Sequence, residues 1–169
     1  MKKILYLAGG CFWGTEQYFR QFPGVISTRV GYANGKTENP TYEDVKKHGS
    51  GHAETVRVEY DDGILPTETL LGYYFDVIDP FSVNKQGEDE GIQYRTGIYW
   101  EDESLIPAIR SVCDEVERKS GRPIAVERVP LRQFFDAEEY HQKYLEKNPG
   151  GYCHIPQSML NRVKKEDRT

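Results

Sequence analysis

The sequence is poor in cysteine and has no long apolar run. Three cysteines in 169 residues are too few for a disulfide framework. The apolar run near the N-terminus, residues 4–8, is too short for the core of a signal peptide and far too short to span a membrane. We therefore expect a cytoplasmic protein of one domain, whose thiols start in the reduced state.

The chain also lacks an excess of positive charge. It carries 22 lysines and arginines against 27 aspartates and glutamates, which gives a formal net charge of −5. Phosphate backbones and anionic lipids repel a protein with a net negative charge, so neither nucleic acid nor a membrane is expected as the main partner. No CxxC pair and no zinc-type spacing of cysteine and histidine occur in the sequence, and no metal is expected.

What the sequence does contain is a cysteine in a distinctive place. Residues 4–8 predict a buried strand and residues 15–22 predict an amphipathic helix, with Gly-Gly-Cys-Phe-Trp-Gly between them. Cys11 is thus expected at a strand-to-helix junction, where unpaired N–H groups and the helix dipole favour an anion. Because the anion of cysteine is its reactive form, we expect the pKa of Cys11 to fall. The alternative is a glycine turn with a buried, inert cysteine.

Alternating and amphipathic patterns predict the remaining elements. Strands are expected at residues 25–32, 53–60, 95–100 and 124–129, a helical turn at 42–45, and helices at 68–77, 103–118 and 138–145. Thr67 is expected to cap the helix at 68–77, and the polar residues 81–94 to form a long functional loop. This order predicts an α+β fold, a two-layer sandwich with helices packed on a mixed, mostly antiparallel sheet, on a ferredoxin-like plan.

No linker is long enough to divide the chain. We expect a catalytic domain at residues 1–147 and a flexible C-terminal tail at residues 148–169, which carries Cys153. Cys113 falls on the apolar face of the helix at 103–118, so it is expected in the core.

Several short motifs, taken together and in order, resemble those of the A-type peptide methionine sulfoxide reductases. They lie between Gly10 and Ile155 and so cover almost the whole chain. The resemblance implies that the protein repairs oxidative damage by reducing the S epimer of methionine sulfoxide, free or within oxidised proteins. The motifs are residues 10–14, 30–32, 39–43, 51–54, 79–80, 86–87, 93–95, 134–135, 137–138 and 140–145.

The resemblance assigns roles to five catalytic side chains. Cys11 would attack the sulfoxide sulfur while Glu54 supplies the proton that the departing oxygen needs. Burial at the start of an apolar strand would raise the pKa of Glu54 and keep it protonated, whereas the alternative is a surface charge on an edge strand. Tyr42 and Tyr94 would donate hydrogen bonds to the oxygen. The sulfenic acid left on Cys11 would then condense with Cys153 to form a disulfide.

The same resemblance implies the substrate pocket and the reductant. Phe12 and Trp13 would enclose the S-methyl group, and Asp79 would support the polar wall, although an Asp-Pro pair is also a common helix stop. Thioredoxin or another dithiol would restore both thiols by exchange, so no organic cofactor or metal is needed. We expect the enzyme to act as a monomer.

The sequence departs from the usual family pattern at three positions. Ile78 stands where a histidine commonly precedes the Asp-Pro pair, and Phe81 where a threonine commonly follows it. Asn34 replaces a frequent glycine in the turn after Tyr32. The single tail cysteine, where some relatives have two, indicates one recycling disulfide.

Two other classes of function compete with this interpretation. A cysteine hydrolase or acyltransferase would use Cys11 and His52 with an acidic residue as a triad. We expect strand alternation to turn His52 away from Glu54, and this mechanism leaves Cys153 without a role. A non-enzymatic redox sensor or peptide-binding module would use Cys11 and Cys153 only as a switch.

Overall fold

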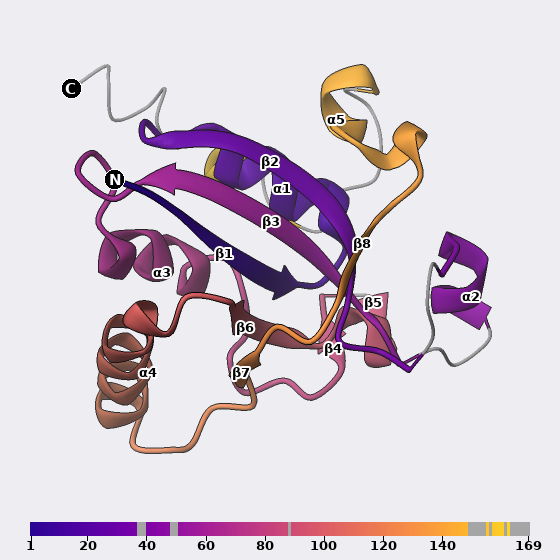
Figure 1. Cartoon of the computed structure of the whole chain (residues 1–169). Helices are drawn as coiled ribbons and strands as arrows, with labels where there is room; N and C mark the ends of the chain where they lie inside the picture. The colour runs from indigo at the N-terminus through magenta and orange to yellow at the C-terminus, as the bar shows by residue number, and fades with distance from the viewer. Residues whose placement is uncertain are drawn as a thin grey trace.

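The computed structural model describes residues 1–36, 40–47, 51–87, 89–148, 155, 157–160 and 162. Cys153 therefore lies outside the described residues. One sheet of six strands, in the order β7-β6-β1-β3-β2-β8, organises the described chain (Figure 1). Its members are β1 (Lys2–Gly9), β2 (Val25–Ala33), β3 (Ala53–Asp61), β6 (Thr96–Trp100), β7 (Glu127–Pro130) and β8 (Phe134–Asp136).

The sheet is mixed, with most of its strands antiparallel. β1 pairs with both β3 and β6, and β2 pairs with β3 and β8, all in antiparallel register. Only β7 runs parallel to its neighbour, β6. The prediction of a single α+β domain with a mixed, mostly antiparallel sheet is confirmed.

Three helices cover one face of the sheet, namely α1 (Phe12–Arg20), α3 (Thr67–Phe75) and α4 (Ile106–Ser120) (Figure 1). Alternate strand residues such as Leu7, Val56 and Ile98 are fully buried against them. Tyr18 of α1 and Leu70 of α3 are fully buried in the same cluster. This layer is the main hydrophobic core, since burial of these side chains is the dominant favourable term in folding.

The opposite face of the sheet carries a smaller apolar cluster. Tyr6, Ala8 and Tyr99 are buried there, and Leu131 and Phe134 pack against them. The chain between β7 and β8 runs in front of the sheet in Figure 1 and so shields part of this face. It also carries the polypeptide from the α4 side of the molecule to the side where α1 begins.

The remaining elements are short. They are α2 (Tyr42–Lys47), β4 (Lys85–Gln86), β5 (Asp89–Glu90), η1 (Ile92–Tyr94), η2 (Glu103–Leu105), η3 (Glu139–His141), α5 (Tyr144–Lys147) and α6 (Gln157–Leu160). β4 and β5 pair with each other inside the stretch predicted as a continuous loop at 81–94. Across the described part of the chain, none of the helices combines the length and the apolar content that crossing a bilayer requires.

Two details of the predicted helices are wrong. Pro66, and not Thr67, is the N-cap of α3; Thr67 lies inside the helix, where its hydroxyl group hydrogen-bonds that of Tyr60 at 2.7 Å. The helix expected at 138–145 is divided into η3 and α5, because Lys143 between them adopts a left-handed conformation with φ of 54°. A residue with positive φ cannot continue a right-handed helix.

Candidate active site

Cys11 is the N-cap residue of α1 and follows β1 almost directly, as predicted. Gly10 makes the sharp turn between the two elements with φ of 91°, a conformation that glycine adopts without strain. The hydroxyl group of Thr15 donates a hydrogen bond to the carbonyl oxygen of Cys11 at 3.2 Å and so fixes the first turn of the helix. Cys11 is 6% exposed, and its place at the N-terminus of a nine-residue helix favours the thiolate.

Glu54 lies next to this junction and is buried. It is the second residue of β3, is 1% exposed, and accepts a hydrogen bond at Oε1 from the backbone N–H of Phe12 at 3.2 Å. The alternative of a surface charge on an edge strand is therefore wrong, because β3 lies between β1 and β2. The fold thus brings a carboxyl group to the residue beside the cysteine, where it can exchange a proton with a bound substrate.

Tyr42 and Tyr94 join Cys11 and Glu54 from two short elements, α2 and η1. Burial is the main cause that raises the pKa of Tyr42 to about 12; Glu54 and Cys11 also contribute to the rise, and a hydrogen bond with Tyr94 acts in the opposite direction. Burial also raises the pKa of Tyr94, with further increases from Glu54, Tyr42 and Cys11. These mutual effects arise only between close groups, so the four predicted side chains share one site. Both phenols stay protonated at neutral pH and can donate hydrogen bonds.

Phe12 and Trp13 form an aromatic wall on the first turn of α1. Phe12 is almost fully buried, and its ring centre lies 5.7 Å from that of Tyr32. Trp13 is only partly buried and stacks on Tyr144 at 3.9 Å with an interplanar angle of 15°. An apolar surface of this kind suits the S-methyl group that the resemblance places here.

His141 belongs to the same wall, although it was not among the residues predicted for the site. Its Nδ1 accepts the indole N–H of Trp13 at 3.0 Å, and its ring lies 5.4 Å from Phe12 and 4.6 Å from Tyr42. Burial lowers the pKa of His141, so its imidazole is neutral and the proton resides on Nε2. The signal in the sequence was the motif at 140–145, which includes both His141 and Tyr144.

Asp79 makes its hydrogen bonds with residues close to it in the chain. Its exposed carboxylate accepts the backbone N–H of Phe81 at 3.0 Å, which closes a tight turn. The side-chain amide of Gln86 makes two hydrogen bonds with the Asp79 backbone, at 2.8 and 3.0 Å. The departures from the family pattern fit locally, because Ile78 packs closely on Gly9 and the guanidinium of Arg122 covers the Phe81 ring at 4.1 Å.

The argument from strand alternation for His52 is wrong. Residues two apart share a face of a strand, and β3 begins only at Ala53, so alternation does not separate His52 from Glu54. The histidine is instead engaged elsewhere: its Nδ1 accepts the backbone N–H of Gly35 at 3.1 Å, and its ring meets Phe135 edge-on. This arrangement gives the imidazole a structural role and weighs against the hydrolase triad.

Cys113 is a free cysteine that lies in the core, as predicted. It is fully buried on α4, and burial raises its pKa to about 11, so it is an unreactive thiol at neutral pH. Among the residues that the structure describes, no three His, Cys, Asp or Glu side chains gather as metal ligands.

The comparison with known families agrees with this geometry. A family model described as peptide methionine sulfoxide reductase matches residues 3–169. The chain belongs to this family. It is 58% identical over 164 residues to "Peptide methionine sulfoxide reductase MsrA" of Lachnoclostridium phytofermentans. The aligned residues cover 97% of this chain and 99% of that protein.

Solved structures of similar proteins have the same fold. Reduced Mxr1 from Saccharomyces cerevisiae is 36% identical to this reductase, with a TM-score of 0.85 over 92% of this chain and 91% of that one. Mxr1 in complex with Trx2 matches at 28% identity and a TM-score of 0.60, over 85% of this chain and 84% of that one.

Proposed function

We propose that this protein reduces the S epimer of methionine sulfoxide, free or within peptides and oxidised proteins, with Cys11 as the nucleophile and Glu54 as the acid. The observation that carries the proposal is the 3.2 Å hydrogen bond from the Phe12 amide to Glu54. It sets a buried carboxyl group beside a thiol at a helix N-terminus, which is the pairing that sulfoxide reduction requires. The printed name of the relative at 58% identity supports the same substrate.

In the first step the Cys11 thiolate attacks the sulfur of the sulfoxide. Glu54 donates a proton to the sulfoxide oxygen, and the hydroxyl groups of Tyr42 and Tyr94 stabilise the charge that develops on it. The net transfer leaves the oxygen on Cys11 as a sulfenic acid. The substrate sulfur gains two electrons and leaves as methionine, and the cysteine sulfur loses two.

Cys153 completes the cycle in this proposal. Its thiol attacks the sulfenic acid of Cys11, an S–S bond forms, and the oxygen leaves as water. Thioredoxin then reduces the disulfide by thiol exchange, so the enzyme needs a dithiol and no organic cofactor. The complex of the similar protein Mxr1 with Trx2 supports a thioredoxin as reductant.

We also infer the finer architecture from the same data. The order β6-β1-β3-β2 of four antiparallel strands, with α1 and α3 in the connections, supports a ferredoxin-like plan. Residues 1–147 would form the catalytic domain and residues 148–169 the tail that delivers Cys153. A cycle through two free thiols needs a reducing compartment, which supports a location in the cytoplasm. We also propose that the enzyme acts as a monomer.

The test is turnover of each epimer separately. With dithiothreitol as reductant, the wild-type protein should convert L-methionine (S)-sulfoxide to methionine and leave the R epimer unchanged. Cys11→Ser should have no activity while keeping its thermal unfolding temperature, because a serine hydroxyl does not ionise at neutral pH. No turnover of the S epimer by the wild type, or retained turnover by folded Cys11→Ser, would refute the proposal.

A further inference from the structure

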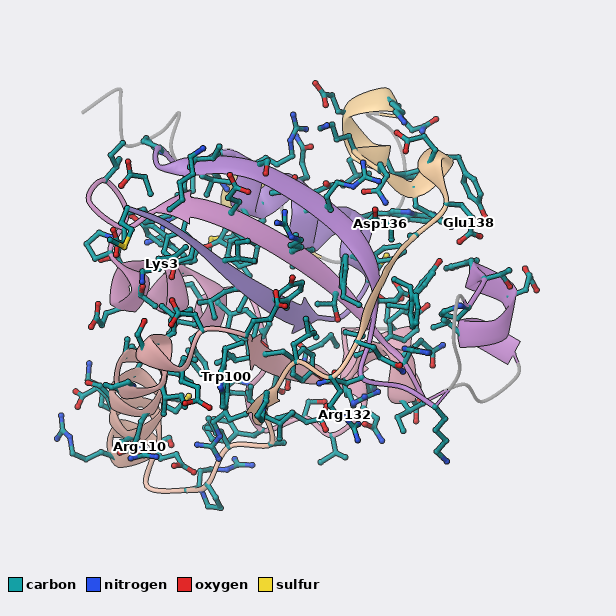
Figure 2. All side chains as sticks on the ribbon, viewed as in Figure 1. Lys3, Trp100, Arg110, Arg132, Asp136 and Glu138 are labelled. Carbon is teal, nitrogen blue, oxygen red and sulfur yellow. The ribbon has the colours of Figure 1, made fainter. Side chains whose placement is uncertain are left out.

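We infer that Glu138 is a positioning residue for sulfoxide reduction, whose carboxylate holds Tyr42 in place in the active site. The inference rests on the proposed function, because Tyr42 acts there on the sulfoxide oxygen. Glu138 follows β8 after one intervening residue, Ala137, and is the N-cap of η3, on the side of the molecule where α2 lies (Figure 2).

The two carboxylate oxygens of Glu138 bind donors from different elements. Oε1 accepts the hydroxyl group of Tyr32 on β2 at 3.1 Å. Oε2 accepts the backbone N–H of Tyr42, the first residue of α2, at 3.2 Å, and the hydroxyl group of Tyr140 on η3 at 3.4 Å. One side chain therefore joins η3 to β2 and α2, through partners that lie 106 and 96 positions away in the chain.

One of these partners is a rigid part of the active site. Tyr32 is fully buried, packs against Phe12, and lies opposite Glu54 in the register of β2 and β3. The core thus fixes one end of the Glu138 carboxylate relative to the nucleophile and the acid. Protein cores are close-packed, so a fully buried side chain such as Tyr32 has little freedom to move and holds the Glu138 carboxylate in a defined position.

The other end of the carboxylate acts on Tyr42 itself. Oε2 of Glu138 accepts a hydrogen bond from the backbone amide of Tyr42, the residue whose hydroxyl group would donate to the substrate oxygen. The backbone of Glu138 adds a second constraint, since its carbonyl oxygen accepts the amide of His141 at 2.9 Å and the His141 ring packs against Tyr42. Loss of the carboxylate should therefore displace the Tyr42 hydroxyl without removing it.

The charge of Glu138 suits this role. Partial burial alone would raise its pKa, but the hydrogen bonds from its own amide, the Tyr42 amide and the Tyr32 hydroxyl outweigh that effect and lower the pKa. The group is therefore ionised at neutral pH and can accept at both oxygens. Hydrogen bonds to an ionised acceptor are stronger than those to a neutral one.

The first part of the test compares three variants in single-turnover reduction of L-methionine (S)-sulfoxide. Glu138→Ala should slow the reaction about 10-fold, the effect of losing one hydrogen bond to a charged group. Glu138→Gln should keep most of the rate, because its amide oxygen can accept the Tyr42 N–H while its NH2 group donates to the Tyr32 hydroxyl. The matched control is Glu139→Gln, which changes an exposed carboxylate that pairs with Arg29 at 3.7 Å and should leave the rate unchanged.

The second part asks whether Glu138 acts through the Tyr42 hydroxyl group. Glu138→Ala should add almost nothing in a Tyr42→Phe background, where that hydroxyl is already absent. In a Tyr94→Phe background, Glu138→Ala should have the same effect as Tyr42→Phe. It should slow the reaction by at least about 100-fold, because both hydroxyl donors to the sulfoxide oxygen are then lost. A merely structural role would give the same fold-change in all three backgrounds.

The possible outcomes separate the inference from the proposed function. Equal fold-changes in the three backgrounds, or a rate for Glu138→Ala equal to that of an active wild type, would overturn the inference alone. A wild type that does not reduce the sulfoxide would overturn the proposed function itself. If Glu138→Ala fails to fold, the same backgrounds are combined with Glu138→Asp, whose shorter carboxylate cannot reach Tyr32 and Tyr42 together.

Discussion

The backbone amide of Phe12 donates a hydrogen bond to Oε1 of Glu54, although the two residues lie 42 positions apart in the chain. A neutral carboxyl group accepts through its carbonyl oxygen and donates from the other oxygen. Oε2 of Glu54 is buried as well. In the proposed reaction, where Glu54 acts as the acid, the amide contact at Oε1 would leave Oε2 as the oxygen that carries and donates the proton.

Replacement of Glu54 by glutamine should slow the chemical step by about 100- to 10,000-fold, the usual contribution of a positioned general acid. The amide keeps the shape of the side chain and can still accept the Phe12 N–H, but it has no acidic proton to give. Single-turnover rates with L-methionine (S)-sulfoxide measure this step directly. Tyr42→Phe and Tyr94→Phe are the matched comparisons, and each alone should cost less because the other donor remains.

The opposite ranking would reassign the acid. If Glu54→Gln reduced the sulfoxide as fast as the wild type and a tyrosine variant were slower, the proton would come from that tyrosine. Thermal unfolding of each variant serves as the control, since Glu54 is buried and its replacement could also change stability.

Replacement of Cys153 by serine should separate the two halves of the cycle. The variant should produce about one equivalent of methionine per enzyme, because the sulfenic acid forms before the second thiol acts. With thioredoxin as reductant it should then stop, whereas a small thiol can still reduce the sulfenic acid. Cys113→Ser is the control and should turn over normally, because Cys113 is fully buried in the core. Sustained thioredoxin-driven turnover by Cys153→Ser would mean that another thiol resolves the intermediate.

The raised pKa values of the two tyrosines predict the alkaline side of the pH profile. A free phenol is half ionised near pH 10, but the pKa of Tyr42 is about 12 and that of Tyr94 is raised as well. Both hydroxyl groups thus keep their protons as the pH rises through about 10. The alkaline fall of the single-turnover rate should have the same midpoint in the wild type, Tyr42→Phe and Tyr94→Phe. A midpoint near 10 that disappears in either variant would show that a phenol titrates.

Asn34 should stabilise the fold through its side chain and its backbone separately. Its Oδ1 accepts the backbone N–H of Arg132 at 2.7 Å, its Nδ2 donates to the carbonyl oxygen of Pro130 at 3.3 Å, and its φ is 55°. Asn34→Gly keeps the backbone conformation and loses these bonds, so the free energy of unfolding should fall by about 1–3 kcal/mol. Asn34→Ala should cost roughly 1 kcal/mol more, because alanine is strained at positive φ. Urea unfolding measures both values, and a glycine variant as stable as the wild type would contradict the first.

The elements that local chemistry determines were predictable from the sequence. The pattern that predicts β1, the turn at Gly10 and α1 lies within residues 2–20, and the position of Cys11 follows from their order. The start of α1 was less predictable: the pattern indicated residue 15, whereas the helix begins at Phe12, since Gly14 is a poor helix former and obscures the first turn.

Other features depend on contacts that no local pattern encodes. β8 has three residues and forms by pairing with Gly31–Ala33 of β2, so its two phenylalanines fit the start of a helix equally well in the sequence. The places of His141 and Glu138 in the site arise from bonds that span 128 residues to Trp13 and 96 residues to Tyr42. Glu54 and the two tyrosines came from family resemblance, because their convergence on Cys11 is also a long-range property.

Two hydrogen bonds join α1 to residues near the end of the described chain. Trp13 donates one to His141, and Glu16 accepts the other from the Lys143 amide at 2.6 Å. Synthesis on a ribosome runs from the N-terminus, so the nucleophile emerges within the first dozen residues, and the segment that completes its pocket emerges after residue 138. A nascent chain therefore lacks the complete aromatic wall beside Cys11 for most of its translation. Only when nearly the whole polypeptide has left the ribosome can Trp13 and Glu16 acquire these two partners, so completion of the pocket is a late step in the folding of each molecule.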